Sequence, residues 1–186
     1  MNGIEDGIRP EGANESFYIH PGITPRQVEQ LIAFTQSETD PIKLGRDGQR
    51  FMSQEQYQEW ANKGRTVYTL TDNGDSEGNL RGIFWAGEKP RPNRLDYREP
   101  LDPDLYRYTY AFRLYDSARG KGISYPVLSA CIDEYVATLP LPAGFWLETN
   151  GANDVAIHMD QKQGFKVVSG IGNQGLVILA REYSKK

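Results

Sequence analysis

The chain has 186 residues, of which 38% are hydrophobic and 25% are charged, and its formal net charge is -4 at pH 7. This length and composition are typical of one globular domain with its own core. No apolar run approaches the roughly 20 residues of a membrane span, and residues 1–10 lack the apolar centre of a signal peptide. The single cysteine, Cys131, excludes an internal disulfide and fits a reducing cytosol. We therefore expect a cytoplasmic protein that does not associate with membranes.

The patterns of charged residues and of potential metal ligands argue against a nucleic-acid-binding protein and against a metal-binding protein. Lys and Arg are scattered along an acidic chain, so nucleic acid is not an expected partner. The acidic balance instead favours a cationic partner such as an amine. No cluster of Cys and His has the spacing of a metal site, so we expect no metal.

Residues 1–16 show no periodic apolar pattern and are expected to form a flexible N-terminal arm, followed by one domain over 17–186. A first strand is predicted at 17–20. The segment Thr24-Pro25-Arg26-Gln27 combines an N-cap, a proline at the first helical position and a capping-box glutamine, and predicts a helix. Residues 40–50 are expected to be a polar loop. A second helix is predicted from Ser53 to Gly64.

The rest of the chain alternates strands and helices. Turn residues between two strand-like runs predict a hairpin, and four prolines in a later segment predict a long loop. The expected elements are strands 66–72 and 80–87, loop 88–104, strand 106–114, helix 123–137, strand 144–149, a short helix after Asn153, and a hairpin of strands 165–168 and 176–181.

A glycine-rich turn between a strand and a helix is the most informative motif. It reads Ser117-Ala118-Arg119-Gly120-Lys121-Gly122-Ile123. Without side chains at the two glycines, the backbone can approach a ligand closely. The following helix N-terminus presents amide groups and the positive end of the helix dipole, so the segment is typical of an anion cradle.

A second motif narrows the interpretation of the glycine-rich turn. Residues 153–165 begin with Asn153, keep Ala156 and Met159, and end in Gly164-Phe165. With the Ser-x-x-Gly-x-Gly turn, this pattern resembles the GCN5-related N-acetyltransferase (GNAT) family over residues 65–183. The resemblance implies an α/β fold: a central mixed, mostly antiparallel sheet of six to seven strands flanked by about four helices.

The resemblance also implies acetyl-CoA as co-substrate and an amine as acceptor. Backbone groups of three strand residues would pair with the pantetheine arm, the turn amides would hold the pyrophosphate, and Asn153 would hydrogen-bond the CoA chain. The implied CoA-binding residues are Phe112, Arg113, Leu114, Arg119, Gly120, Lys121, Gly122, Ile123, Ser124 and Asn153.

Two positions depart from the family pattern. Ser117 replaces the usual Gln or Arg of the turn. Asp160 stands where many members carry the tyrosine that protonates the departing thiolate, so Asp160 either donates a proton, holds a cationic acceptor or faces away. Tyr115, near the strand end, is a candidate to replace the missing phenol.

Glu148 is the candidate general base, because the attacking amine must be neutral and Glu148 lies near the end of the strand that precedes the Asn153 helix. The alternative is a surface carboxylate or a ligand of the acceptor's ammonium. Tyr108, Tyr110 and Trp85 either line the acceptor cleft or pack in the core. His20 and Cys131 are expected to be structural, and His158 to be solvated or packed.

Two other functions remain open from the sequence. One is a CoA-binding or regulatory module that has lost turnover, which the departures at Ser117 and Asp160 favour. The other is a nucleotide protein, although the turn lacks the P-loop and dinucleotide-binding patterns. The acceptor is not identified, and a homodimer stays open because dimers are common among similar proteins.

Overall fold

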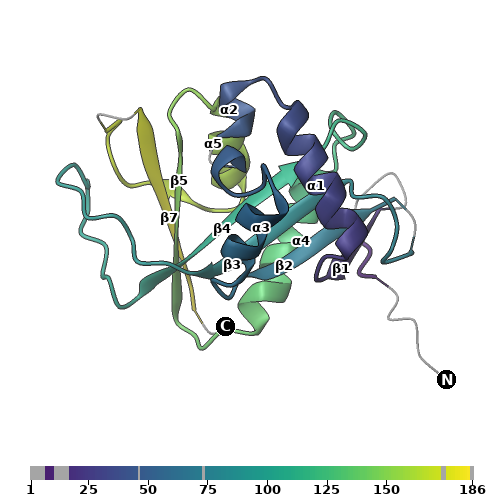
Figure 1. Ribbon diagram of the computed structural model, residues 1–186. Coiled ribbons are helices and arrows are strands. Elements are labelled where there is room, and N and C mark those ends of the chain that lie inside the picture. The colour runs from purple at the N-terminus through teal and green to yellow at the C-terminus, as the bar shows by residue number, and fades with distance from the viewer. Residues whose placement is uncertain (1–6, 11–16, 46, 73, 173–174, 185–186) are drawn as a thin grey trace. The chain divides into compact units, whose positions relative to one another are not determined.

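The computed structural model describes all residues except 1–6, 11–16, 46, 73, 173–174 and 185–186 (Figure 1). The helical elements are α1 (Pro25–Ser37), α2 (Pro41–Leu44), the 3-10 helix η1 (Asp47–Gln49), α3 (Gln54–Ala61), α4 (Ser124–Ala137) and α5 (Asp154–Lys162). The strands are β1 (Tyr18–Pro21), β2 (Thr66–Thr71), β3 (Gly82–Glu88), β4 (Tyr106–Leu114), β5 (Ala143–Asn150), β6 (Lys166–Val167) and β7 (Leu176–Tyr183).

Seven strands form one mixed sheet in the order β1-β2-β3-β4-β5-β7-β6. The pairs β1–β2, β5–β7 and β6–β7 are antiparallel, whereas β4 and β5 are parallel. A parallel pair needs a crossover connection, and α4 supplies it here. The predicted fold class is therefore confirmed.

Local sequence signals account for several helix ends. The Thr24 side chain accepts a hydrogen bond from the Gln27 amide, and the Gln27 side chain accepts one from the Thr24 amide. The Ser53 hydroxyl caps α3 in the same way at Gln56. Gly164 ends α5 with a φ of 86°, a conformation that glycine adopts without steric cost.

The chain folds into two compact units. The first comprises residues 1–85 and 112–131, and the second comprises residues 86–111 and 132–186. In the first unit, an aromatic cluster of Phe51, Trp60 and Trp85 packs edge to face, with ring centroids 4.9 to 5.7 Å apart. The prediction of a single domain over 17–186 stays a prediction.

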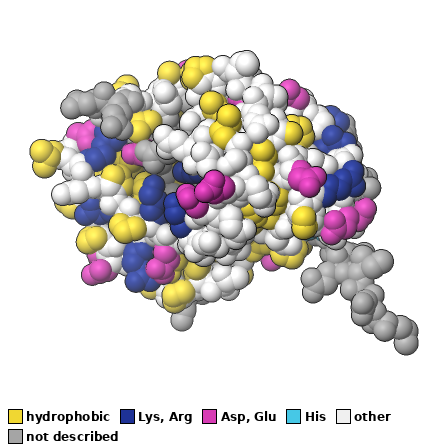
Figure 2. All heavy atoms as spheres, viewed as in Figure 1, with side chains coloured by type: hydrophobic (Ala, Val, Ile, Leu, Met, Phe, Trp, Pro, Cys, Tyr) yellow, Lys and Arg dark blue, Asp and Glu magenta, His cyan; other side chains and the backbone are white. Residues whose placement is uncertain are grey.

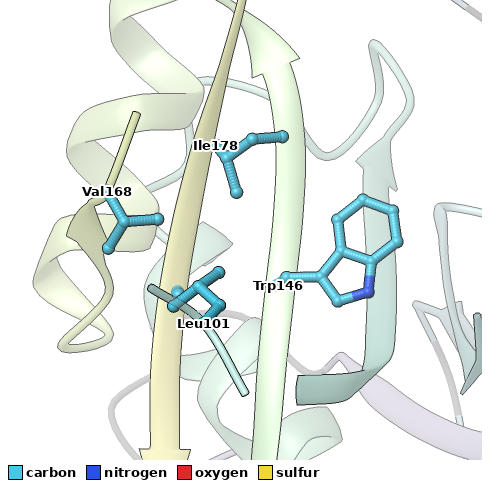
Figure 3. Packing of buried hydrophobic residues seen from close by; sticks show 5 residues of the cluster. Leu101, Trp146, Val168 and Ile178 are labelled. Carbon is cyan, nitrogen blue, oxygen red and sulfur yellow. The ribbon is translucent and has the colours of Figure 1, made fainter. Parts of the chain in front are cut away.

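In the second unit, a hydrophobic cluster covers one face of β5 and β7. Figure 3 shows Leu101, Val168, Ile178 and Trp146 gathered around these strands, and Ala180 completes the cluster. Leu101 belongs to the long loop 88–104, so this loop contributes to the core. The Trp146 indole also donates a hydrogen bond to the Lys89 carbonyl at 2.9 Å.

The loop 88–104 is fixed by backbone and side-chain contacts to the β6–β7 hairpin, beside which it extends in Figure 1. Tyr97 and Ser169 form an isolated antiparallel bridge. The Arg94 guanidinium donates to the carbonyls of Gly170 and Leu176 at 3.1 and 3.0 Å, and pairs with Asp96. Figure 2 shows basic and acidic side chains next to one another on the side that carries this loop.

The segment 40–50 and the N-terminal residues differ in part from the sequence predictions. The segment 40–50 is not a plain loop, because it contains α2 and η1. The Asp40 side chain accepts from the Ile42 amide at 2.9 Å and so helps α2 to begin. Most of the expected N-terminal arm lies outside the described residues, but Ile8 within it pairs with Ile19 through two backbone hydrogen bonds.

Candidate functional site

The glycine-rich turn joins β4 to α4 in the first unit. Gly120 and Gly122 have φ values of 73° and 71°, and no described protein atom lies within 4 Å of the position that a Cβ would take at either glycine. Among the described residues, the amides of Gly120, Gly122 and Ile123 have no hydrogen-bond acceptor. An open backbone surface with unpaired amides at the start of a 14-residue helix can bind an anion.

The two basic side chains of the turn are already engaged. The Arg119 guanidinium donates to the Leu114 carbonyl and to Asp116, both at 2.7 Å, and lies 3.9 Å from Glu38. The Arg119 amide donates to the Tyr115 carbonyl. The Lys121 ammonium lies 5.6 Å from the centre of the Phe17 ring. Arg119 therefore shapes the turn, and the amides that follow it are the groups of the turn that stay open to a ligand.

The end of β4 leads into this turn and is held from several sides. The Tyr115 amide donates to the Arg81 carbonyl at 2.9 Å, and Leu114 is buried. Arg113 is half-buried, and its guanidinium lies 2.8 Å from the carboxylate of Asp47. Phe112, Arg113 and Leu114 thus form a strand end of fixed geometry.

The predicted Asn153 helix is α5 in the second unit. The Asn153 side-chain oxygen accepts from the Ala156 amide at 3.2 Å, as expected of an N-cap. Asn153 is only half-buried. Because the capping bond uses the side-chain oxygen, the amide nitrogen is the group of this side chain that suits a ligand.

Asp160 lies on α5 and faces the protein interior. It is 6% exposed, and its Oδ1 accepts a 2.8 Å hydrogen bond from the Tyr110 hydroxyl of β4. Burial raises the pKa of Asp160 to about 6, although the hydrogen bond from Tyr110 lowers it. Burial and the nearby Asp160 charge raise the pKa of the Tyr110 phenol well above its usual value.

Glu148 is half-buried near the end of β5. Side chains alternate along a strand, so Glu148 shares a sheet face with Trp146. That face carries the loop 88–104. The hydrogen bond to Asp96 is the main cause of the raised pKa of Arg94, and burial is the main cause of the raised pKa of Tyr97; the Glu148 charge adds a smaller contribution to each. Glu148 therefore faces a polar, cation-containing environment within the second unit.

Tyr115 is buried, and its ring stacks on Phe34 with centroids 4.2 Å apart. Its hydroxyl has no hydrogen-bond partner among the described residues. Burial raises the pKa of the phenol, so Tyr115 is a weaker acid than an exposed tyrosine. To donate a proton to a ligand, this hydroxyl needs a path out of its buried position.

The remaining candidate side chains are buried, except that of His158. Tyr108 and Tyr110 are buried and pack against Phe145, with centroids 5.6 and 6.5 Å away. Trp85 belongs to the aromatic cluster of the first unit, and Cys131 is buried. His20 is buried within 3.1 Å of the Thr71 hydroxyl. His158 is exposed.

Asp47 was missed by sequence reasoning. It lies in the segment 40–50, where no motif marks it, yet it is only 3% exposed and pairs with Arg113 and Arg50. In the part of the chain that the structure describes, no group of three or more His, Cys, Asp or Glu side chains is arranged to hold a metal ion. None of the described helices has the length and apolar character needed to cross a bilayer.

No protein-family model and no curated protein sequence matches this chain. Solved structures do match it. Spermidine N-acetyltransferase from Vibrio cholerae, in complex with CoA and spermine, is 13% identical, with a TM-score of 0.58 over 90% of this chain and 95% of that chain. Arabidopsis thaliana NAA60 in complex with acetyl-CoA is 18% identical, with a TM-score of 0.58 over 89% and 98%.

The GNAT domain of S. lividans PAT is 17% identical, with a TM-score of 0.57 over 90% of each chain. Each of these three matches covers about nine-tenths of this chain. At this level of identity the likeness establishes the fold. The chain has the fold of the GCN5-related N-acetyltransferases.

Proposed function

We propose that the chain is an acyltransferase that transfers an acetyl group from acetyl-CoA to an amine by direct attack in a ternary complex. The observation that supports this most is the open turn at Gly120 and Gly122, whose amides meet the start of α4. A pyrophosphate fits this surface, since it can approach the backbone without displacing a side chain. The similar structures with bound CoA and acetyl-CoA agree with this choice of ligand.

The proposed binding residues form three groups. Backbone groups of Phe112, Arg113 and Leu114 would pair with the pantetheine arm. The turn would hold the pyrophosphate, and the Asn153 side chain would contact the CoA chain. The turn residues in this role are Arg119, Gly120, Lys121, Gly122, Ile123 and Ser124; for Arg119 the structure favours a supporting role, because its guanidinium and amide have protein partners.

Bound acetyl-CoA supplies an activated thioester, and the protein contributes mainly by holding both reactants together. The amine nitrogen attacks the carbonyl carbon, the carbon–sulfur bond breaks, and CoA leaves as a thiolate. Glu148 is our candidate to take the proton from the amine, directly or through water. Tyr115 and Asp160 are our candidates to return a proton to the thiolate.

A CoA-binding module without turnover is the second candidate function. The burial of both candidate proton donors favours it, since neither Tyr115 nor Asp160 presents its acidic group at the surface. Transfer and binding are separable by experiment, and the acceptor class is open to a direct search.

The test combines a melting curve with an assay for free thiol. CoA at about 100 times its Kd should stabilise the native state by about 2.7 kcal/mol. Acetyl-CoA with a panel of polyamines, amino acids and peptides should release thiol and yield an acetylated amine by mass spectrometry. Stabilisation without product would favour the module, and the absence of both would overturn both functions.

A further inference from the structure

The side chain of Asp47 is almost fully buried and holds two arginines. Its Oδ2 lies 2.8 Å from Nη2 of Arg113, in an ion pair that lacks the geometry of a hydrogen bond. Its Oδ1 accepts a 3.4 Å hydrogen bond from Nη1 of Arg50. Arg113 Nη2 also reaches the Leu44 carbonyl at 3.5 Å. The segment 44–50 thus holds the Arg113 side chain through a carboxylate and a carbonyl.

This arrangement is expensive for the fold. Burial raises the pKa of Asp47, although the charges of Arg113 and Arg50 lower it, so removing this carboxylate from water opposes its ionised form. Buried ion pairs of this kind are often no better for stability than apolar side chains of similar volume. The Asp47 pair therefore calls for a reason other than stability.

The position of Arg113 supplies that reason. Arg113 stands between Phe112 and Leu114 at the end of β4, where neighbouring groups are fixed as well: the Leu114 carbonyl accepts from Arg119 at 2.7 Å, and the Tyr115 amide donates to Arg81. The Arg113 carbonyl is close to Gly82, where an added Cβ would lie 2.9 Å from it. Asp47 adds the contact that fixes the Arg113 side chain.

We propose that Asp47 is a positioning residue for acetyl-CoA. Its carboxylate holds the Arg113 guanidinium and so fixes the backbone at the end of β4 in the geometry that pairs with the pantetheine arm. The inference rests on the proposed function and deepens it, because it assigns a role in CoA binding to the segment between α1 and α3. Asp47 acts through Arg113 and does not touch the reacting atoms.

The decisive variant is Asp47→Asn, which keeps the shape of the side chain and removes its charge. We expect the Kd for CoA and the KM for acetyl-CoA to rise on the order of tenfold, a typical coupling between contacting residues. We expect kcat and the KM for the amine to stay within about twofold to threefold. The melting temperature should fall, because Asp47→Asn leaves the largely buried Arg113 charge without its carboxylate. Hydrogen exchange of the amides at 112–115 should become faster.

Asp72→Asn is the matched control, because Asp72 also pairs with an arginine of the first unit, Arg81, but is exposed. It should leave the Kd for CoA unchanged. In a double-mutant cycle, Arg113→Met should weaken CoA binding, and adding Asp47→Asn should weaken it no further. Independent, additive effects of the two changes would overturn the proposal.

The outcomes distinguish a failure of the proposed CoA-dependent function from a failure of the positioning role of Asp47. A parent protein that binds no CoA overturns the proposed function and this role together. A parent that binds CoA, with an Asp47→Asn variant that binds it equally well, overturns only the role of Asp47. If Asp47→Asn fails to fold, the apolar pair Asp47→Leu with Arg113→Met replaces it, and parental CoA affinity in that folded variant would overturn the proposal.

Discussion

The hydroxyl of Tyr110 donates a 2.8 Å hydrogen bond to Oδ1 of Asp160, and this contact joins β4 to α5 within the second unit. Both side chains are buried. A carboxyl group that is removed from water prefers its neutral form, which explains why the pKa of Asp160 is raised. The hydrogen bond with Tyr110 therefore makes Asp160 part of the buried packing of the second unit.

This pair predicts a pH dependence of stability. Because the pKa of Asp160 is raised from 3.8 to about 6 in the folded state, the folded protein binds this proton more tightly than the unfolded chain. The contribution is complete below about pH 4 and is lost as the pH rises through about 6. A difference of this size corresponds to a free energy on the order of 3 kcal/mol.

Urea denaturation of the parent and of Asp160→Asn at several pH values between 4 and 8 checks this prediction. The comparison isolates Asp160, because the raised pKa of Asp47 affects both proteins alike. The free energy of unfolding should shift in favour of Asp160→Asn as the pH rises. A constant difference between the two proteins across this range would show that Asp160 does not titrate as described.

Gly122→Val should abolish strong CoA binding, because the new side chain would occupy the space above the turn. None of the described protein atoms blocks a Cβ there, but the φ of 71° strains residues other than glycine, at a cost of about 1–3 kcal/mol. Gly64→Val is the matched control, since Gly64 has a φ of 68° and equally open surroundings at the end of α3.

We expect similar losses of melting temperature in the two glycine variants, and a loss of CoA affinity of at least about tenfold in Gly122→Val alone. Calorimetry gives the affinity and circular dichroism gives the folded fraction in the same sample. Equal CoA affinity in both folded variants would move the pyrophosphate site away from the turn.

Glu148→Gln should lower kcat by roughly 100-fold or more if Glu148 is the general base, with little change in the Kd for CoA. Glutamine keeps the shape of the Glu148 side chain, which lies on the same face of β5 as Trp146. Glu182→Gln serves as a control, because Glu182 is an exposed carboxylate of the same unit on β7. A Glu148→Gln enzyme with parental kcat at every pH would exclude Glu148 as the base.

Tyr115→Phe separates packing from chemistry. The Tyr115 hydroxyl is buried without a partner, so its removal should leave the free energy of unfolding unchanged or raise it by up to about 1 kcal/mol. The stack on Phe34 is retained. If Tyr115 returns the proton to the thiolate, kcat should fall at the same time; unchanged kcat would leave this role to Asp160 or to water.

Arg94→Ala should release the loop 88–104 from the β6–β7 hairpin, because the guanidinium donates to two hairpin carbonyls. Hydrogen exchange near residues 96–98 and 168–170 should become faster, while the amides of β4 and β5 keep their protection. Arg98→Ala, at an exposed side chain of the same loop, is the control. Unchanged exchange in the Arg94 variant would assign the anchoring to the Tyr97–Ser169 bridge instead.

Much of the fold follows from local signals in the sequence. The Thr24–Gln27 capping box, the Asn153 cap and the Gly164 stop each act within a few residues, so the chain reveals them without knowledge of the packing. The glycine turn between β4 and α4 is local in the same sense. The sequence by itself therefore determined the fold class and the order of the main strands and helices, but not α2 and η1. The binding of an anion at the turn stays a prediction.

Only the tertiary structure decided which distant side chains meet. The position of Asp160 can be recognised in the sequence from the family pattern, but its buried partner Tyr110 belongs to another element. Asp47 likewise pairs with Arg113, which is far away along the chain. The anchoring of loop 88–104 to Gly170 and Leu176 is equally nonlocal. Such contacts depend on how the elements pack, and packing depends on burial over the whole unit, which no short motif encodes.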